Sequence, residues 1–371
     1  MKKNLAKVAA GCLAAALWLT SPATQAQEAG RFYGMLRSRD LTPFGFLRLD
    51  MRPAHAVSIE KHTFAFEAEL GYQNTWALSE NVEKYLTSLE GRGRREIGPA
   101  EIQAIRDLPG ENYLLDLESA TLDLTMHYKI SSQWTFYAIA TAVSYEGGFL
   151  DSTIEGFHDL VGLGTYGRLA VPRNGIHAIF DLKGAQLVMT NPPTRQGFLD
   201  PTFGLRYTGI GLPKGWEMSI ETAVKAAWGG ERPLLSTGHT DYGMQASLRR
   251  LGERNAVHVD FSAVYYSGQE MPSIEESQII PTVVIGWERQ MSARTNMNLQ
   301  AYASKSVYRH EQTDLDELLS DKFQMSIGVR HLFDCCLTTF AITENLQNLN
   351  NTPDIGFQLG FAWVPRLKPQ H

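Results

Sequence analysis

The chain has 371 residues, a formal net charge of −6 at pH 7 and a mean hydropathy of −0.22. No stretch reaches 18 apolar residues, which excludes helical membrane spans, and the acidic balance gives no indication of a nucleic-acid partner. A β-barrel is compatible with this mildly polar average, because alternating strands mix apolar with polar residues.

The first 26 residues have the three parts of a secretory signal peptide. Residues 1–7 carry three lysines, residues 8–20 are apolar, and residues 21–26 form a small-residue cleavage region in which residues 24–26 precede the expected cut. Removing them takes away three lysines and no acid, which leaves 31 basic and 40 acidic side chains. A lipoprotein signal at Cys12 is disfavoured, because the apolar run follows this cysteine. The prediction is a mature chain that begins at about Gln27 and is exported.

Residues 27–61 precede the first expected barrel strand. Residues 46–52 alternate, but Pro43 and Pro53 bracket them, which weakens a central strand. Two interpretations therefore remain open: an extra strand or periplasmic tail, or a segment folded into the lumen as a plug. Four arginines would make this plug basic, facing acidic walls such as Glu67, Glu69, Glu217 and Glu221; they are Arg37, Arg39, Arg48 and Arg52.

The clearest strand signal covers residues 216–228, where apolar and polar residues alternate and a tryptophan stands at each end of the apolar face. A strand of this length extends about 40 Å, or about 30 Å vertically when tilted by about 40°. That distance is close to the hydrocarbon thickness of a bilayer, with aromatic rings at both interfaces.

The same period of two recurs along residues 62–365, while residues 366–371 form an expected periplasmic tail. The pattern predicts an all-β, antiparallel transmembrane β-barrel of about fourteen strands, with twelve to sixteen left open. Short and long connections alternate, as periplasmic turns and external loops do in such barrels. The expected strands are residues 64–72, 120–128, 134–145, 163–171, 176–189, 202–209, 216–228, 241–250, 256–267, 279–289, 295–306, 322–332, 337–344 and 354–364.

Charged residues on the polar side of these strands are candidates for the lumen wall. One interpretation is a set of salt bridges that satisfies buried groups, and the other is a polar pathway or binding site. The polar side also carries His258 and Lys305. The lumen candidates are Glu67, Glu69, Asp123, Arg206, Glu217, Glu221, Lys225, Asp241, Arg249, Asp260 and Arg330.

The external loops contain short stretches with apolar residues at helical spacing. They follow Ser79 and Gly98, and they recur at residues 154–161 and 315–319. Such helices either pack over the barrel rim or form an apolar groove that collects hydrophobic ligands. Between the first two lies a basic cluster that is either merely solvated or positioned to contact lipopolysaccharide phosphates; it consists of Arg92, Arg94 and Arg95.

Cys335 and Cys336 lie in an expected periplasmic turn. They form a strained disulfide with each other, remain reduced, or bridge to a partner. No cofactor or metal is expected, because the ten histidines show no metal-ligand spacing. The G-x-G-x-x-G at residues 162–167 is not taken as a dinucleotide fingerprint, because it lacks the required strand before it and helix after it.

Two stretches carry a resemblance to known proteins. RDLTPFGFLRLDMRPAHA, together with IEGFHDLVGLGTYGR, resembles an uncharacterised family of secreted proteins of Gram-negative bacteria, over most of the mature chain. That family implies no activity. In architecture alone, with fourteen strands, an N-terminal lumen segment and helical loops, the chain is similar to the long-chain fatty-acid transporter family of the outer membrane.

Three functional classes follow from these observations. The first is a passive outer-membrane channel or transporter for hydrophobic or small solutes. The second is a barrel for adhesion or envelope structure, and the third is an outer-membrane enzyme, which is not expected because no H-x-S-N-G-type motif is present. The expected partners are outer-membrane lipid, lipopolysaccharide and the barrel-assembly machinery.

Overall fold

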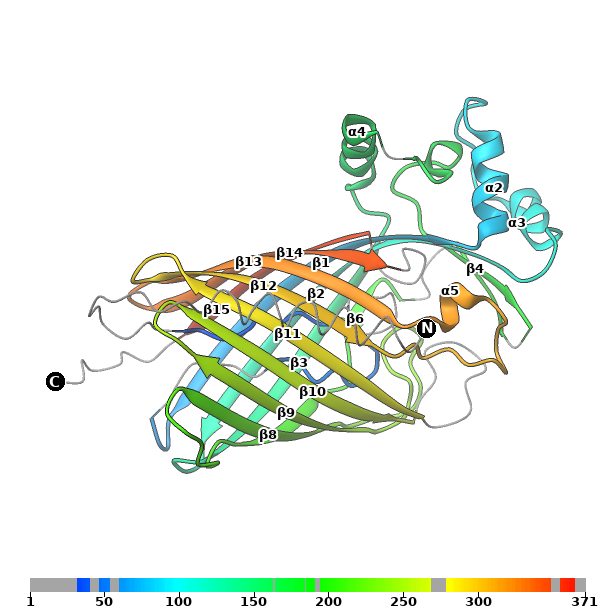
Figure 1. Ribbon diagram of the computed structural model, residues 1–371. Helices are drawn as coiled ribbons and strands as arrows, with labels where there is room; N and C mark the ends of the chain where they lie inside the picture. Colours follow the sequence, from blue (N-terminus) through cyan, green and yellow to red (C-terminus); the bar gives the residue numbers. More distant parts are fainter. Residues whose placement is uncertain are drawn as a thin grey trace.

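The fold is a closed antiparallel β-barrel of twelve strands (Figure 1). The computed structural model describes residues 32–40, 47–53, 60–162, 164–183, 185–190, 194–267, 278–347 and 354–363. The expected signal peptide and the expected tail at residues 366–371 lie outside the described residues. The ring closes where the first barrel strand pairs with the last, Phe66 lying opposite Trp363.

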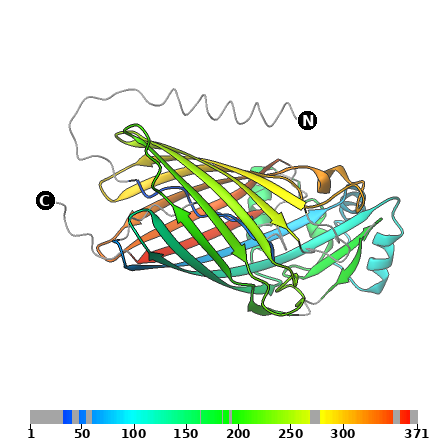
Figure 2. The same cartoon turned by 90° about the horizontal axis from the view of Figure 1, so that it is seen from below.

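Each barrel strand pairs with its neighbours along the chain once the long loop after the third strand is set aside. The turns between strands cluster at the end opposite the helices (Figure 2). The twelve barrel strands are β1 (Phe64–Leu78), β2 (Asn112–Lys129), β3 (Trp134–Glu146), β7 (Thr202–Tyr207), β8 (Trp216–Lys225), β9 (Asp241–Leu251), β10 (Asn255–Tyr266), β11 (Gln278–Gln290), β12 (Thr295–Ser304), β13 (Lys322–Leu332), β14 (Cys336–Gln347) and β15 (Ile355–Trp363).

The expected count of fourteen is wrong by two strands, both within the loop between β3 and β7. Residues 163–171 were expected to form a strand, but the described part contains the short 3-10 helix η2 (Arg168–Ala170). Residues 176–189 form the hairpin of β4 (His177–Leu182) and β5 (Ala185–Met189), which extends the loop end of β2. A third short strand, β6 (Gln196–Phe198), pairs with β3.

Strand β8 also ends earlier than expected, at Lys225 rather than Trp228. Two side chains draw the backbone out of the sheet here: the amide of Ala227 donates to Thr240, and that of Trp228 donates to Asp200. Trp228 therefore belongs to a loop.

The barrel exposes its apolar side chains and buries its polar ones. In β8, Ile220 is exposed on the outer face, whereas Ser219 and Glu221 on either side of it are buried. Aromatic pairs gather at the turn end, as in the interfacial girdle of a barrel in a bilayer. They are Phe64 with Tyr128, Phe66 with Trp363, and Trp134 with Tyr207. This exterior is suited to lipid, and the alternation expected from sequence is confirmed.

All four expected loop helices are present: α2 (Glu80–Leu89), α3 (Pro99–Arg106), α4 (Asp151–Val161) and α5 (Asp316–Leu319). Trp76 and Leu114, on the outer side of β1 and β2, pack against Leu86 of α2 and Ile105 of α3. The helices thus cover strands that extend past the bilayer belt. Among the described residues, no helix is long and apolar enough to cross a membrane.

Candidate functional site

The described residues of the N-terminal segment, 32–40 and 47–53, lie inside the barrel, where their blue ribbon is enclosed by strands (Figures 1 and 2). The backbone amides of Tyr33 and Gly34 donate to the carboxylate of Glu288, at 2.7 and 3.0 Å. Arg330 donates to the carbonyls of the same two residues. Strands β11 and β13 thereby hold the start of the segment.

Two arginines of the segment converge on one carboxylate of the wall. Arg39 and Arg52 lie 3.1 and 2.8 Å from Asp123 of β2, and Thr141 of β3 donates a further hydrogen bond to it. All three charged groups are buried. Since one wall carboxylate holds both stretches of the segment, Asp123 is its principal electrostatic anchor.

A second acidic position of the wall lies on β1. Glu67 is 3.5 Å from Arg37 of the segment and 2.7 Å from His127 of β2. Its neighbour Glu69 accepts a hydrogen bond from Gln358 of β15. These contacts bind the segment to the region where the barrel closes.

Three and four strands from β2 around the ring, the neighbouring strands β8 and β9 hold the second stretch. Lys225 and Asp241 are register partners whose charged groups lie 2.9 Å apart. Lys225 donates to the carbonyl of Leu47, and the amide of Leu49 donates to Asp241 at 2.9 Å. A wall ion pair thus also satisfies the backbone of the segment.

The two stretches of the segment also bind each other. Arg48 forms an ion pair with Asp40, whose amide donates to Asp50 at 2.8 Å. Lys322 of β13 lies 3.5 Å from the same Asp40 carboxylate. The segment is therefore a compact unit with internal charge pairs.

Glycines in the wall provide room for the apolar side chains of the segment. A Cβ at Gly286 would lie 2.6 Å from the side chain of Met35, and one at Gly243 would lie 2.6 Å from that of Met51. A Cβ at Gly328 would lie 2.8 Å from the side chain of Leu36. Real Cβ atoms essentially never approach so closely, so alanine at Gly286 or Gly243 would force the methionine side chain opposite to move, and alanine at Gly328 would also meet the carbonyl oxygen of Phe340. The wall is shaped to this segment.

The loop end of the barrel is filled by an apolar cluster, which we call the mouth cluster. It joins Leu47 of the segment to Tyr113 of β2, Tyr145 of β3, Phe180 of β4 and Leu318 of α5. The rings of Tyr113 and Phe180 are stacked with centroids 5.9 Å apart. The remaining buried members of the mouth cluster are Ala77, Leu115, Leu117, Val143, Ala178, Leu182, Met189 and Leu199.

Of the eleven lumen candidates, five contact the segment: Glu67, Asp123, Lys225, Asp241 and Arg330. Two others pair within the wall, since Arg206 lies 2.8 Å from its register partner Glu221.

The remaining candidates have different positions. Asp260 is buried opposite Ser247, whereas Glu217 is largely exposed near the turn end and lies 3.7 Å from Arg249. Glu69 contacts β15, as described above. Lys305 follows the end of β12 and is exposed. The expected acidic wall opposite the segment is therefore correct for Glu67 but not for Glu217 or Glu221, which pair with wall arginines.

Glu288 is, besides Lys322, a charged contact residue that the sequence-based selection missed. It is buried in β11, accepts from Asn296 of β12 and pairs with His258 of β10 at 3.0 Å. The signal was available, because Glu288 has the same parity as the inward residues of the expected strand 279–289. The wall glycines that contact Met35, Leu36 and Met51 could not be identified from the sequence, because alternation does not show which side chain lies against a glycine.

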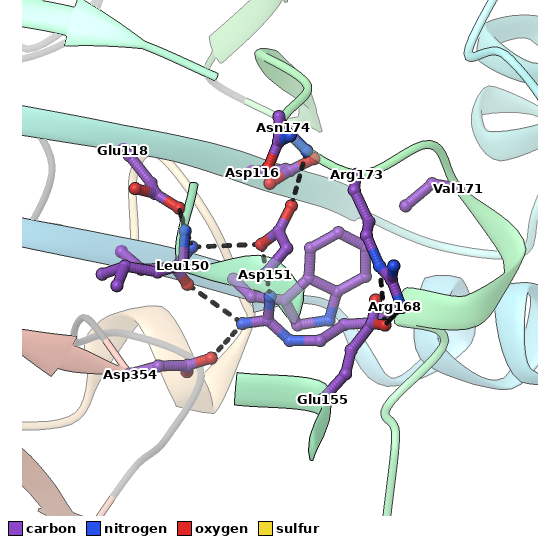
Figure 3. A network of polar contacts seen from close by, with 12 residues as sticks. Asp116, Glu118, Leu150, Asp151, Glu155, Arg168, Val171, Arg173, Asn174 and Asp354 are labelled. Atoms are coloured by element: carbon purple, nitrogen blue, oxygen red, sulfur yellow. Dashed lines mark hydrogen bonds and ion pairs between the residues drawn. The ribbon is translucent and has the colours of Figure 1, made fainter. Parts of the chain in front are cut away.

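Outside the lumen, a second polar network fixes the loops around α4, and we call it the loop network (Figure 3). Buried Arg168 donates to Asp151 and Asn74, both at 3.1 Å, forms an ion pair with Asp354 and lies over the ring of Trp76.

Two carboxylates extend the loop network. Glu118 accepts from the amides of Phe149 and Leu150 at 3.1 and 2.8 Å. Glu155 accepts from Arg173 and from Arg94. Burial acts to raise the pKa of Glu155, but the hydrogen bonds from these two arginines prevail and hold it below its ordinary value. Arg94 also donates to two loop carbonyls, so its guanidinium group contacts the loop itself.

Cys335 lies in the expected turn between β13 and β14, and Cys336 is the first residue of β14. Their sulfur atoms are 2.8 Å apart, and both are free thiols. Within the described residues, no group of three or more His, Cys, Asp or Glu side chains could hold a metal ion.

Residues 108–363 match the model of a family described as "Protein of unknown function (DUF3187)". The chain belongs to this family, in agreement with the uncharacterised family that its sequence resembles. None of the curated proteins matches the chain.

Solved structures of outer-membrane proteins are similar in fold. The COG4313 outer membrane channel from Pseudomonas putida F1 has 10% identity and a TM-score of 0.49, covering 83% of this chain and 97% of that one. The NanC porin has 7% identity and a TM-score of 0.41, covering 80% and 98%. The P. putida toluene transporter TodX has 12% identity and a TM-score of 0.40, covering 83% and 92%.

Proposed function

We propose that the chain is a passive outer-membrane channel whose lumen is closed at rest by its N-terminal segment acting as a plug. The observation that carries the proposal is the attachment of this basic segment to both sides of a polar lumen. Arg39 and Arg52 hold it to Asp123 of β2, and Glu288 of β11, on the opposite side of the ring, accepts from the amides of Tyr33 and Gly34.

The chemistry of these contacts favours a removable plug over a permanent core. Most are ion pairs or hydrogen bonds between polar groups, and water can replace such partners when the segment leaves. The segment's apolar side chains lie against wall glycines at Met35, Leu36 and Met51, and they also pack on apolar wall residues such as Tyr137 and Tyr302. A polar wall remains suited to water after the segment has moved.

The mouth cluster indicates the class of solute. It places apolar side chains across the loop end, including those of Leu47, Tyr113 and Phe180. Hydrophobic constrictions oppose hydrated ions because water is unstable between apolar walls. Small uncharged apolar molecules pass such a constriction at lower cost, so we assign these as the solutes. A purely structural barrel would have no need of a removable segment.

The plug is tested by recording currents in planar bilayers from the mature chain and from a variant that lacks residues 27–53. We expect low conductance from the intact chain and at least a tenfold higher mean conductance from the deletion. Arg250→Gln is the matched control, because Arg250 lies over the outer ring of Trp216 and should leave the current unchanged. Faster migration of unboiled protein on a detergent gel verifies that each barrel is closed. A closed deletion variant with wild-type conductance would refute the plug.

The solute class is tested separately in cells. Cells that express the chain should take up the neutral apolar fluorophore N-phenyl-1-naphthylamine faster than cells with an empty vector. Their uptake of the charged, hydrophilic nitrocefin should be unchanged. Equal gains for both probes would overturn the apolar preference and leave the plug to the conductance experiment.

A further inference from the structure

The part of the loop at α4, residues 149–160, exposes three large apolar side chains outside the barrel. Phe149 is 64% exposed just before α4, and Phe157 and Leu160 of that helix are 55% and 83% exposed. Phe157 and Leu160 are three residues apart and therefore neighbours on the helix surface. The other apolar position in the helix with a described side chain, Ile154, is buried. The exposed set forms a distinct apolar surface, which we call the α4 surface.

The position of the α4 surface along the bilayer normal follows from its contact with strand β1. Phe149 stacks on Tyr72 of β1, with ring centroids 5.0 Å apart. Tyr72 lies on the outer face of β1, eight residues beyond Phe64 in the girdle at the turn end. At about 3.4 Å per residue and a tilt of about 40°, this separation is roughly 21 Å along the bilayer normal. An apolar belt is about 25 Å tall, so Tyr72 and Phe149 lie at its opposite edge.

The loop that carries the α4 surface is fixed to the barrel. Glu118 of β2 holds the amides of Phe149 and Leu150. Asp151 at the first turn of α4 accepts from Arg168 and from the amide of Asn174. In Figure 3 these groups converge beside the strand of Glu118. The three exposed side chains therefore belong to a loop that is fixed to the barrel.

The position of α4 indicates what covers the α4 surface. In Figure 1 the helix stands to the side of the barrel wall at the loop end, rather than across the mouth. A helix placed there lies over the bilayer surface that surrounds the barrel. Its apolar residues continue the lipid-facing side of β1 through the contact between Tyr72 and Phe149. The surface that completes this continuous apolar face is the lipid of the outer leaflet.

We propose that Phe149, Phe157 and Leu160 insert into the outer leaflet and anchor the α4 loop at the membrane surface. Aromatic and aliphatic side chains on an interfacial helix bury their apolar groups at the boundary between headgroups and acyl chains. The anchor uses lipid acyl chains and needs no particular headgroup. It does not depend on the transport of a solute through the lumen.

The test measures the contact of single α4 positions with lipid. Cys335 and Cys336 are replaced by serine in the full mature chain, and cysteine is introduced as Phe157→Cys, Leu160→Cys or Asp159→Cys. Each variant is labelled with bimane and reconstituted in phosphatidylethanolamine and phosphatidylglycerol vesicles. These vesicles contain phosphatidylcholine with a spin label near the top of one acyl chain, and iodide serves as the aqueous quencher.

Asp159 is the matched control because it is exposed on the same helix but lies on the face opposite Phe157. We expect lipid quenching at positions 157 and 160 to exceed that at position 159 about threefold, with iodide quenching in the reverse order. Equal quenching by iodide at all three positions would overturn the anchor. Protection of positions 157 and 160 from both quenchers would also overturn it, because the surface would then be covered by protein.

Discussion

The N-terminal segment and the α4 loop are both held to the barrel by buried arginines, but on different foundations. Around Arg168, charge pairs are combined with an apolar core in which Trp76 and Leu86 are buried. In the lumen, Arg39 and Arg52 meet Asp123, while the segment's apolar residues lie against wall glycines and pack in smaller apolar clusters of the wall.

This difference has an energetic consequence. Burial of apolar side chains stabilises by about 25 cal/mol per Å² of apolar area removed from water. Buried ion pairs contribute little net stability, because desolvation offsets most of their attraction, yet losing one partner is costly. The loop is therefore expected to remain in place under conditions that release the segment, and the predictions below separate the two.

The largest expected effect is that of Asp123→Asn. It leaves Arg39 and Arg52 buried without their counter-charge, at a cost of about 3–5 kcal/mol. That cost favours release of the segment about a hundredfold or more. The mean conductance in planar bilayers should rise accordingly, while unboiled protein still migrates as a closed barrel. Asp260→Asn is the control, since Asp260 is buried in the same wall opposite Ser247. Wild-type conductance in the Asp123 variant would show that this carboxylate is not the anchor.

A smaller effect, confined to the loop, is expected for Arg168→Gln. The change removes the counter-charge of Asp151 and Asp354 and the stacking on Trp76, at a cost of about 3 kcal/mol. The apolar core beneath the loop should limit the result to local opening. Chymotrypsin should then cleave after Phe157 at least ten times faster, with unchanged conductance.

The control for this variant is Arg92→Gln, because Arg92 is an exposed arginine in the neighbouring helical loop. A change in conductance with no change in cleavage would contradict the proposal that Arg168 fixes the α4 loop and leaves the N-terminal segment in place. Chymotrypsin is chosen because substitution of an arginine does not alter its cleavage sites.

The twelve barrel strands and the four loop helices could be predicted because each has one apolar face in regular spacing. The hairpin of β4 and β5 has strand character too, and alternation alone does not tell a barrel strand from a loop strand. A different signal separates them. Ala178, Ile179 and Phe180 are consecutive apolar residues, all buried, as expected of a strand covered on both faces.

The partners within the lumen were harder to predict than the strands. Strand parity places Asp123 and Glu288 inside, but the pairing of Arg52 with Asp123 depends on how the segment folds back. That geometry has no periodic signal. The glycines are the extreme case, because the reason for Gly286 becomes visible only when Met35 lies against it.

The smallest of the three effects is therefore the most specific, and it comes from Gly286→Ala. The added methyl group would meet the side chain of Met35 at 2.6 Å, and such overpacking costs about 1–3 kcal/mol. The population with the N-terminal segment released from the lumen should rise about tenfold to a hundredfold. The conductance should therefore rise less than in Asp123→Asn. Gly211→Ala is the control, because a Cβ at Gly211 meets nothing within 4 Å.

A second substitution distinguishes loss of the contact between Gly286 and Met35 from destabilisation of strand β11 itself. In Gly286→Ala combined with Met35→Ala, the smaller side chain makes room for the added methyl group, so conductance should return toward the wild-type level. A strand weakened by the alanine itself would stay conductive whatever residue stands at position 35. Rescue by Met35→Ala would thus tie the closed state to one contact between wall and segment. Around Arg168 the loop is held by its apolar core and by charge pairs.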